Sequence, residues 1–282
     1  MEREIALLGL LSDPNKISLD VGANIGEYTD VLQRTSREVH FFEPVPELGS
    51  ILSEKFSRHQ NAFFYPCAAS NRTSVAQLRI PTLARIGEWF PCATIEESNQ
   101  LNYDAVRSTP VLTCPLDSFG FLDVGFIKID TEGHELAVLQ GASALLARDR
   151  PNLLIEAEER HRPGALASVA SYLRQFGYSG CFHSEESKSY LPISHFKSEI
   201  HQTIRNVDGP YYCYNFIFST SLELLVELEN HGRTLSSQPT ELPTSFDSSS
   251  YLRLNPDVAA AGMEAAHHFL SFGWREGRKW GE

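Results

Sequence analysis

The sequence has no apolar stretch long enough to cross a membrane. Its first apolar run extends only from Ile5 to Leu11 and follows a segment of mixed charge, so we expect neither a signal peptide nor a membrane span. Basic residues are also scarce: the formal net charge is −12, and lysine and arginine form no cluster. Proteins that bind nucleic acids neutralise phosphates with basic surfaces, so this charge argues against a nucleic-acid partner.

Cysteine is sparse as well. The five cysteines are widely spaced and form no C-x-x-C pair, which is typical of core thiols in a reducing cytoplasm rather than of a disulfide framework or a metal site. The chain of 282 residues is 42% hydrophobic and 21% charged. These values are ordinary for a globular protein and allow one large domain with a small appendage. We therefore expect a cytoplasmic protein without a metal centre.

A strand, a tight loop and a helix are predicted between Ile17 and Thr29. A short apolar run ends at Val21, Gly22 and Gly26 mark a turn, and a helical pattern follows. This order is typical of the first βα unit of a doubly wound sheet. Glycines have no Cβ, so they let the backbone turn sharply and approach a ligand closely. The N-terminus of the helix offers free N–H groups to that ligand.

The second predicted strand ends at an acidic residue. Val39–Phe42 is apolar and is followed by Glu43, where a carboxylate can accept both hydroxyls of a ribose. The glycine loop lacks the third glycine of a dinucleotide motif and has no G-K-[S/T]. Asp20 and Asn24 suit an ammonium and a carboxylate, and S-adenosylmethionine carries both groups without a phosphate. We therefore predict S-adenosylmethionine as the cofactor; a sheet turn that binds no nucleotide is the alternative.

The end of the third predicted strand could accommodate the adenine of the cofactor, and the segment after it could contact the substrate. Residues 63–70 predict a strand that ends in small residues, which leave room for a flat ring or simply pack tightly. Residues 71–116 then interrupt the alternation of strands and helices, with strand patterns only at 75–80 and 111–113. Long insertions on this side of a sheet usually shape access for the substrate. Candidate substrate contacts in the insertion are Arg85, Trp89 and Arg107, although each can also be an ordinary surface or packing residue.

Polar side chains follow the fourth and fifth predicted strands. Phe126–Asp130 leads into a helix that begins near His134, and Asn152–Glu156 carries an acid at its end. Ligands bind at this edge of open α/β sheets. Glu132 has a simpler explanation, since acidic residues in a first helical turn complement the helix dipole.

Four motifs resemble those of the FkbM family of S-adenosylmethionine-dependent methyltransferases. They are Leu19–Gly26, Phe42–Pro46, Leu116–Phe119 and Phe126–Glu135, the last with Val138-Leu139 and Gly141-Ala142 behind it. Together they cover roughly residues 5–220. The resemblance implies an α/β fold: a Rossmann-like, doubly wound sheet of the class I methyltransferase type, seven-stranded, with an antiparallel last strand over 211–218.

The resemblance also implies the activity, which is O-methylation of a hydroxyl on a sugar, a glycan or a related natural product. The implied cofactor contacts, with their sequence neighbours added, are Asp20, Gly22, Ala23, Asn24, Gly26, Tyr28, Thr29, Glu43, Cys67, Ala68 and Asp130. The implied substrate side is Asp130, Glu132 and His134.

A sugar hydroxyl is too weak an acid to ionise at pH 7, so a general base would assist the transfer. His134 has the most suitable unperturbed pKa, Asp130 can orient or share the proton, and Glu156 is the reserve. Orientation alone, without a base, is a further possibility. Asp130, Glu132, Glu156 and Glu158 could also hold Mg²⁺, but such carboxylates are common without a metal, and we predict none.

The C-terminal part of the sequence reads as a separate unit. Residues 234–250 are rich in serine, proline and threonine and predict a linker between a methyltransferase domain (1–233) and a small α-helical module (251–282). The module is similar to one found in bacterial glycosyltransferases, which implies a protein partner in a carbohydrate pathway. A non-catalytic recruitment protein on a cofactor-binding fold is therefore the alternative function. A dehydrogenase is disfavoured by the missing glycine, and an amino-methyltransferase by the absence of N/D-P-P-Y/F after the fourth strand.

Overall fold

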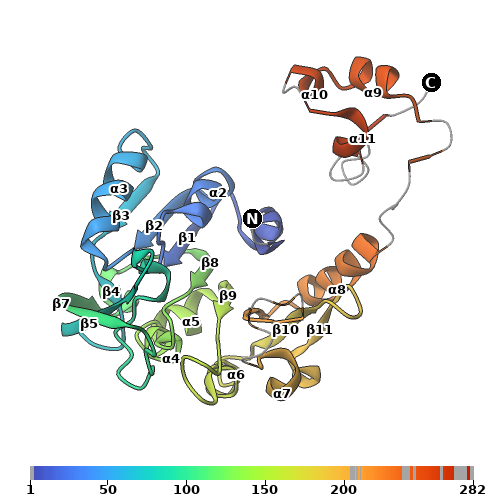
Figure 1. Cartoon of the computed structure of the whole chain (residues 1–282). Coiled ribbons are helices and arrows are strands. Elements are labelled where there is room, and N and C mark those ends of the chain that lie inside the picture. The colour runs from blue at the N-terminus through green and yellow to red at the C-terminus, as the bar shows by residue number, and fades with distance from the viewer. Residues whose placement is uncertain are drawn as a thin grey trace.

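The computed structural model describes residues 3–203, 207, 209, 211–236, 242–243, 246–260, 263–269 and 278–279. Its main feature is an eight-stranded sheet (Figure 1) in the order β11-β10-β12-β9-β8-β1-β2-β3. The strands are β1 (Ile17–Val21), β2 (Glu38–Phe42), β3 (Ala62–Tyr65), β8 (Val124–Ile129), β9 (Asn152–Glu156), β10 (Ser179–Ser184), β11 (Ser189–Pro192) and β12 (Asn215–Ser219).

Five neighbouring strands of this sheet, from β3 to β9, are parallel, and β12 is antiparallel to both β9 and β10. The predicted doubly wound α/β fold with an antiparallel last strand is therefore confirmed. The predicted number of seven strands is wrong, because β11 adds an eighth at the edge. Its four residues pair antiparallel with β10 from Cys181↔Pro192 to Ser184↔Ser189, and so short a strand has little pattern of its own.

Two apolar layers enclose the sheet. One contains residues of α4 (Glu135–Gln140), α5 (Ser143–Asp149) and α6 (Ala165–Arg174). The other contains residues of a 3-10 helix η1 (Arg3–Leu7), α1 (Leu8–Leu11), α2 (Glu27–Thr35) and α8 (Leu222–Ser236).

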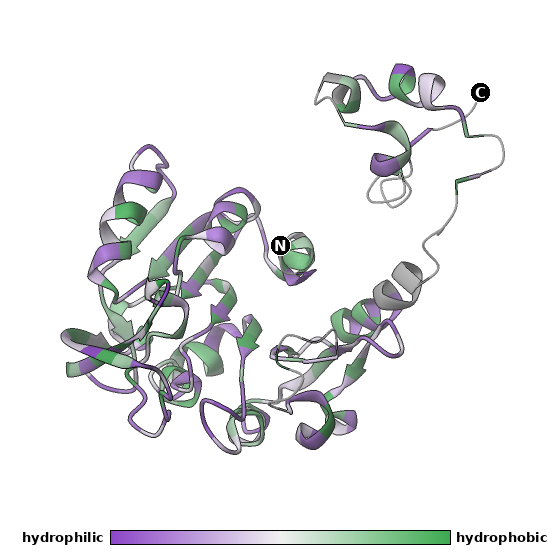
Figure 2. Ribbon diagram, viewed as in Figure 1, coloured by the Kyte–Doolittle hydropathy of each residue, from purple (hydrophilic) through white to green (hydrophobic). Residues whose placement is uncertain are grey.

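Alternate side chains of one strand enter opposite layers: Phe126 packs with α2 and α8, and Ile127 with α4 to α6. Figure 2 shows the strands of the sheet as largely hydrophobic, whereas α3 (Pro46–Phe56) carries both hydrophilic and hydrophobic residues. Smaller helices complete this part: η3 (Leu116–Phe119), η4 (Ile193–His195) and α7 (Ser198–His201).

The insertion forms a second sheet rather than a loop. It has four strands in the order β4-β7-β5-β6: β4 (Ala68–Ala69), β5 (Ser74–Leu83), β6 (Gly87–Glu88) and β7 (Ala105–Cys114), with a 3-10 turn η2 (Phe90–Cys92). The single strand predicted over 63–70 is wrong, because β3 belongs to the large sheet and β4 to the small one. Pro66, which has no N–H, lies between them. The strand predicted over 75–80 is also too short, since β5 continues to Leu83.

The C-terminal residues are helical, as predicted: α9 (Ser248–Leu254), α10 (Pro256–Ala260) and α11 (Ala265–His268). Their apolar residues form a cluster of their own, which contains Tyr251, Val258, Ala265 and Phe269. Because α8 ends at Ser236 and α9 begins at Ser248, both ends of the predicted linker are helical. Residues 237–241, 244–245 and the tryptophans at 274 and 280 lie outside the described residues. Among the helices that the structure describes, none is both long and apolar enough to span a membrane.

Candidate functional site

The loop after β1 is shaped by two glycines with positive φ. Gly22 has φ +80°, and a Cβ at this position would lie 1.8 Å from the carbonyl oxygen of Asp130. Gly26 has φ +77°, and its Cβ would lie 2.7 Å from Cε2 of Phe56. Side chains at these positions would therefore collide with the protein itself. The predicted sharp turn is confirmed by the positive φ of both glycines, and their missing Cβ atoms let the loop pack against Asp130 and α3. Close approach of this loop to a ligand stays a prediction.

A pocket with a volume of about 570 Å³ opens at the carboxyl ends of β1, β2 and β8. We call it the first pocket. Six of the predicted cofactor residues line it: Gly22, Asn24, Glu43, Cys67, Ala68 and Asp130. Sequence patterns did not predict its opposite wall, which comes from the insertion and includes Leu78, Phe90, Pro91, Ala93, Thr94 and Ile95.

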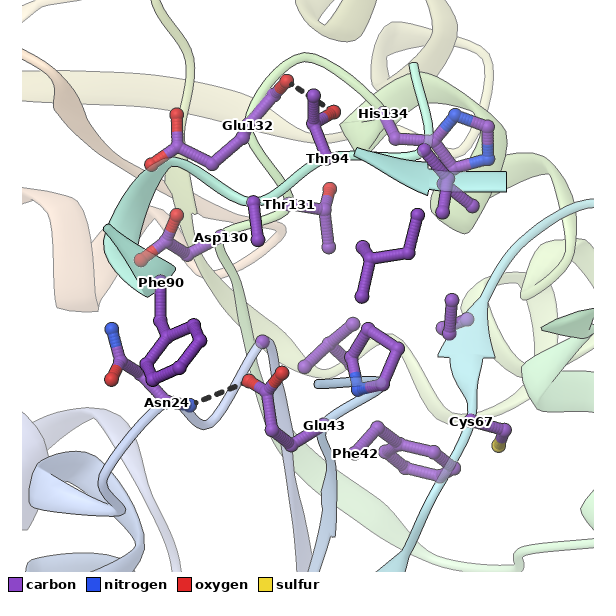
Figure 3. A pocket seen from close by; sticks show the side chains of 18 of the residues that line it. Asn24, Phe42, Glu43, Cys67, Phe90, Thr94, Asp130, Thr131, Glu132 and His134 are labelled. Atoms are coloured by element: carbon purple, nitrogen blue, oxygen red, sulfur yellow. Dashed lines mark hydrogen bonds between the residues drawn. The ribbon is translucent and has the colours of Figure 1, made fainter. Parts of the chain in front are cut away.

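Glu43 lies in the wall of the first pocket. Its two carboxylate oxygens accept hydrogen bonds from the backbone N–H groups of Asn24 and Val45, each at 2.8 Å; Figure 3 shows the bond from Asn24. The residue is 5% exposed, and burial raises the pKa of the carboxyl group to about 7. Each oxygen has a second lone pair, so the fixed carboxylate can still accept hydrogen bonds from a ligand.

Asp20 does not line the first pocket but lies beneath it, fully buried. Its Oδ2 accepts a 2.6 Å hydrogen bond from the hydroxyl of Thr29, and burial raises the pKa of the carboxyl group. Lys128 donates to Oδ2 of Asp130 at 2.9 Å and lies 4.8 Å from the ring centre of Tyr28. Asp20, Tyr28 and Thr29 therefore support the floor of the pocket. Ala23 and Gly26 also do not line it, since Ala23 packs in a cluster with Phe41, Leu52 and Phe56.

His134 lies at the edge of the first pocket with both ring nitrogens engaged. Nε2 is 2.9 Å from the hydroxyl of Ser70, and Nδ1 is 3.1 Å from Oε2 of Glu96. The hydrogen bond from His134 lowers the pKa of Glu96 to about 2, although burial opposes this. An ionised carboxylate only accepts, so Nδ1 donates to Glu96, while the hydroxyl of Ser70 engages Nε2. This leaves no free ring nitrogen to accept a proton from a substrate.

Glu132 has an unusual backbone that the insertion holds in place. Its φ is +56°, and its carbonyl oxygen accepts 2.9 Å hydrogen bonds from the side chains of Thr94 and Asn99. The carboxylate of Glu135 accepts from the N–H of Gly133 at 2.8 Å and so closes the turn. Left-handed backbone is rare for non-glycine residues and is often retained at functional sites.

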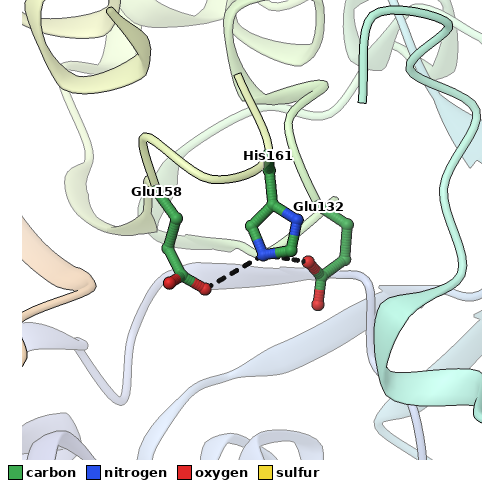
Figure 4. Close-up of side chains that lie close together, drawn as sticks. All are labelled: Glu132, Glu158 and His161. Atoms are coloured by element: carbon green, nitrogen blue, oxygen red, sulfur yellow. Dashed lines mark hydrogen bonds and ion pairs between the residues drawn. The ribbon is translucent and has the colours of Figure 1, made fainter. Parts of the chain in front are cut away.

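A histidine that sequence reasoning missed holds two carboxylates together. Nε2 of His161 is 2.8 Å from Oε2 of Glu132 and 3.0 Å from Oε1 of Glu158 (Figure 4). Burial opposes the charge of the ring, but the two carboxylates prevail and raise the pKa of His161 to about 9. Arg160 also binds Glu158, at 2.7 and 2.8 Å. In the sequence, the spacing Glu158-x-Arg160-His161 after β9 is the pattern that could have indicated this cluster.

These residues border a second pocket of about 960 Å³. It shares Asn24, Pro91, Asp130 and Glu132 with the first pocket. Its remaining lining includes Glu156, Glu158, Arg160, Trp89, Tyr103, Tyr212 and Tyr214.

Carboxylate oxygens of Asp130, Glu132 and Glu156 lie within 4.8 Å of one another and could hold a cation. Burial and then the neighbouring carboxylates raise the pKa of Glu156 well above its usual value. In the described part of the chain, no hydrogen bond or ion pair engages this carboxylate.

The predicted substrate residues of the insertion have different positions. Trp89 lines the second pocket. Arg107 is bound by Glu47 at 2.8 Å and by Glu88, and the exposed Arg85 lines neither pocket. A substrate role for Trp89 stays a prediction, and its position in the second pocket supports it. Arg85 and Arg107 line neither pocket, so their predicted substrate roles have no such support.

A family model described as the methyltransferase FkbM domain matches residues 20–179, which is more than half of the chain. The chain belongs to the FkbM methyltransferase family. The resemblance of the four motifs is thereby confirmed. The C-terminal helices lie outside the matched residues, so their similarity to a glycosyltransferase module stays a prediction.

Comparison with curated proteins found no match. Among solved structures, methyltransferase FkbM from Methylobacillus flagellatus is 21% identical over 77% of this chain and 48% of its own, with a TM-score of 0.48. The present chain thus spans about half of that protein. The Streptococcus mutans protein SMU.1697c, in complex with SAH, is 11% identical over 78% and 98% of the two chains, with a TM-score of 0.42. An rRNA methylase from Streptococcus thermophilus is 11% identical over 76% and 91%, with a TM-score of 0.39.

Proposed function

We propose that this FkbM-family protein is an S-adenosylmethionine-dependent O-methyltransferase that modifies a hydroxyl of a sugar, a glycan or a related natural product. The observation that carries the proposal is Glu43, a buried carboxylate with both oxygens anchored by backbone N–H groups in the wall of the first pocket. Such a carboxylate suits the two hydroxyls of a ribose. Among the described residues, no lysine or arginine lines this pocket, which suits a cofactor without phosphates.

The chain's own residues supply positioning and proton transfer. When bound, S-adenosylmethionine supplies a methyl group on a positively charged sulfur. Asp130, which Lys128 holds from below, lies where the two pockets meet and can orient an acceptor hydroxyl. Bond formation at the hydroxyl oxygen releases a proton, which a base must take.

Glu156 is the best-supported base. It lines the second pocket, its carboxylate has no partner in the described residues, and burial together with the neighbouring carboxylates raises its pKa, which makes it a stronger base than an ordinary carboxylate. His134 is a weaker candidate than its unperturbed pKa suggests, because Ser70 and Glu96 occupy its nitrogens. Asp130 is less available as well, since Lys128 donates to its Oδ2.

Calorimetric titration with S-adenosylhomocysteine (SAH), the demethylated cofactor, tests this function. We expect binding of SAH and none of NAD. Glu43→Ala should weaken SAH by about 1.5–3 kcal/mol, or tenfold or more, because it removes charge-assisted hydrogen bonds to the ribose. Glu38→Ala, at the other end of β2, is the matched control and should leave affinity unchanged. Unchanged SAH affinity in a folded Glu43→Ala protein would contradict the cofactor assignment.

A further inference from the structure

The second pocket lies where a methyl acceptor would have to bind. It meets the first pocket at Asn24, Asp130 and Glu132, the residues at the ends of β1 and β8. A molecule in the second pocket therefore contacts the same residues as the end of a cofactor in the first. The volume of about 960 Å³ leaves room for a ring with substituents.

Aromatic side chains form much of its wall. Trp89 and Tyr103 come from the insertion, and Tyr212 and Tyr214 come from the segment before β12. The ring centres of the two latter tyrosines are 6.3 Å apart. Aromatic faces offer flat apolar surface against which a ring can stack, while their polar edges face other partners. The hydroxyl of Tyr212, for example, donates to Glu158. This wall suits a cyclic acceptor.

Among the described residues, each cationic group at the second pocket has a carboxylate partner. The guanidinium of Arg160 binds both oxygens of Glu158, so its planar fork is occupied. His161 is shared between Glu132 and Glu158, and Lys128 is paired with Asp130. Glu156 is the remaining carboxylate, without a cationic partner in the described residues. An anionic ligand would thus meet acidic oxygens and, among the residues that the structure describes, no cation without a carboxylate partner.

We propose that the second pocket binds the methyl acceptor as an uncharged ring and rejects acceptors that carry a phosphate or a carboxylate. The proposal rests on the proposed function and narrows its substrate class: the hydroxyl is methylated on a neutral glycoside or aglycone, not on a sugar phosphate or a nucleotide-activated sugar. A unit negative charge within about 4–5 Å of Glu156 should reduce acceptor binding by about a hundredfold or more.

Quenching of Trp89 fluorescence tests the charge selectivity without a known acceptor. The chain has three tryptophans, so Trp274→Phe and Trp280→Phe in the full chain isolate the signal of Trp89. Iodide and caesium are the charged probes, at constant ionic strength, and acrylamide is the neutral probe. Relative to free N-acetyltryptophanamide, we expect the ratio of iodide to caesium quenching constants to fall at least about threefold. Acrylamide should quench freely.

Charge variants connect this result to the pocket. Glu156→Gln should raise the iodide-to-caesium ratio, and Glu156→Lys should raise it further. Glu223→Lys, with the same charge change on the exposed start of α8, is the control and should leave the ratio unchanged. Iodide quenching as efficient as that of free tryptophan would overturn the proposal. So would an iodide-to-caesium ratio that the substitutions of Glu156 leave unchanged.

The SAH titration keeps the two proposals apart. If SAH binds but iodide quenches Trp89 freely, the cofactor assignment stands and the charge selectivity fails. If iodide is excluded but SAH does not bind, the pocket is selective and the proposed methyltransferase function fails.

Discussion

Because Gly22 has no side chain, the loop after β1 can lie directly against the end of β8, and these two strands carry the site. Gly22 lies against the carbonyl group of Asp130. A Cβ on residue 22 would collide with this carbonyl, so the loop after β1 can lie beside the end of β8 only because residue 22 is glycine. Asn24, which accepts a positive φ of 51° two residues later, then directs its N–H to Glu43. The first pocket thus depends on backbone geometry at one residue.

Gly22→Ala should therefore destabilise the protein by at least about 2 kcal/mol, because the Cβ adds a collision to the strain of a positive φ. Gly177→Ala is the matched control, since Gly177 also has a positive φ (+83°) but no atom within 4 Å of its Cβ position. It should cost only about 1 kcal/mol. Urea unfolding of both variants measures the difference; equal losses would show that the contact with Asp130 is relaxed easily.

At the scale of elements, the site is a junction of three segments: the turn after β8, the turn after β9 and the insertion. His161 ties the first two together through Glu132 and Glu158. Asn99 of the insertion binds both the carbonyl of Glu132 and Nδ1 of His161, at 2.9 and 3.0 Å. Ion pairs and hydrogen bonds through His161 and Asn99 thus connect three separate segments beside the second pocket.

Removing this bridge should have a pH-dependent cost. The pKa of His161 is raised from 6.5 to about 9, so its contribution of about 3 kcal/mol is complete below pH 6.5 and is lost as the pH rises through 9. His161→Gln should be about 3 kcal/mol less stable at pH 6.5 and approach the unmodified protein at pH 9.5. Urea unfolding at both pH values measures this. His195→Gln, at an exposed position, is the control; a deficit in His161→Gln that does not shrink with pH would contradict the charged bridge.

At the scale of the whole molecule, the C-terminal helices have their own apolar cluster. Tyr251, Val258, Ala265 and Phe269 pack together with Phe246, Leu252 and Met263, and Asp247 caps α9 by accepting from the N–H of Ser250. None of these residues lines the first or second pocket. We infer that this unit serves recruitment in a carbohydrate pathway rather than catalysis, as its resemblance implies.

A chain that ends at Ser236 keeps α8 and should bind SAH with an affinity within about twofold of the full chain, since no contact at the first pocket is removed. Calorimetry on the two proteins makes the comparison. Loss of SAH binding in a folded shortened chain would show that residues 237–282 belong to the catalytic fold, and the two-domain interpretation would fail.

Local sequence determined the strands that carry the first pocket. The apolar runs that end at Val21 and at Phe42 place Gly22 and Glu43 at one edge of a parallel sheet, since strand ends meet there whatever the rest of the chain does. The family motifs are likewise continuous stretches. Strand patterns of this length are local, so both the fold class and Glu43 could be predicted from them.

Tertiary structure alone decided which polar groups are free to act. His134 was the more attractive base from its ordinary pKa, but the sequence could not show that Ser70 and Glu96, 64 and 38 residues away, occupy its nitrogens. Strand patterns at 75–80 and 111–113 were visible in the sequence, but the full length of β5 and β7 and their pairing into a separate sheet were not, because these strands stabilise each other only after they pair. Burial and long-range hydrogen bonds determine whether a carboxylate or an imidazole is available, and both exist only in the folded chain.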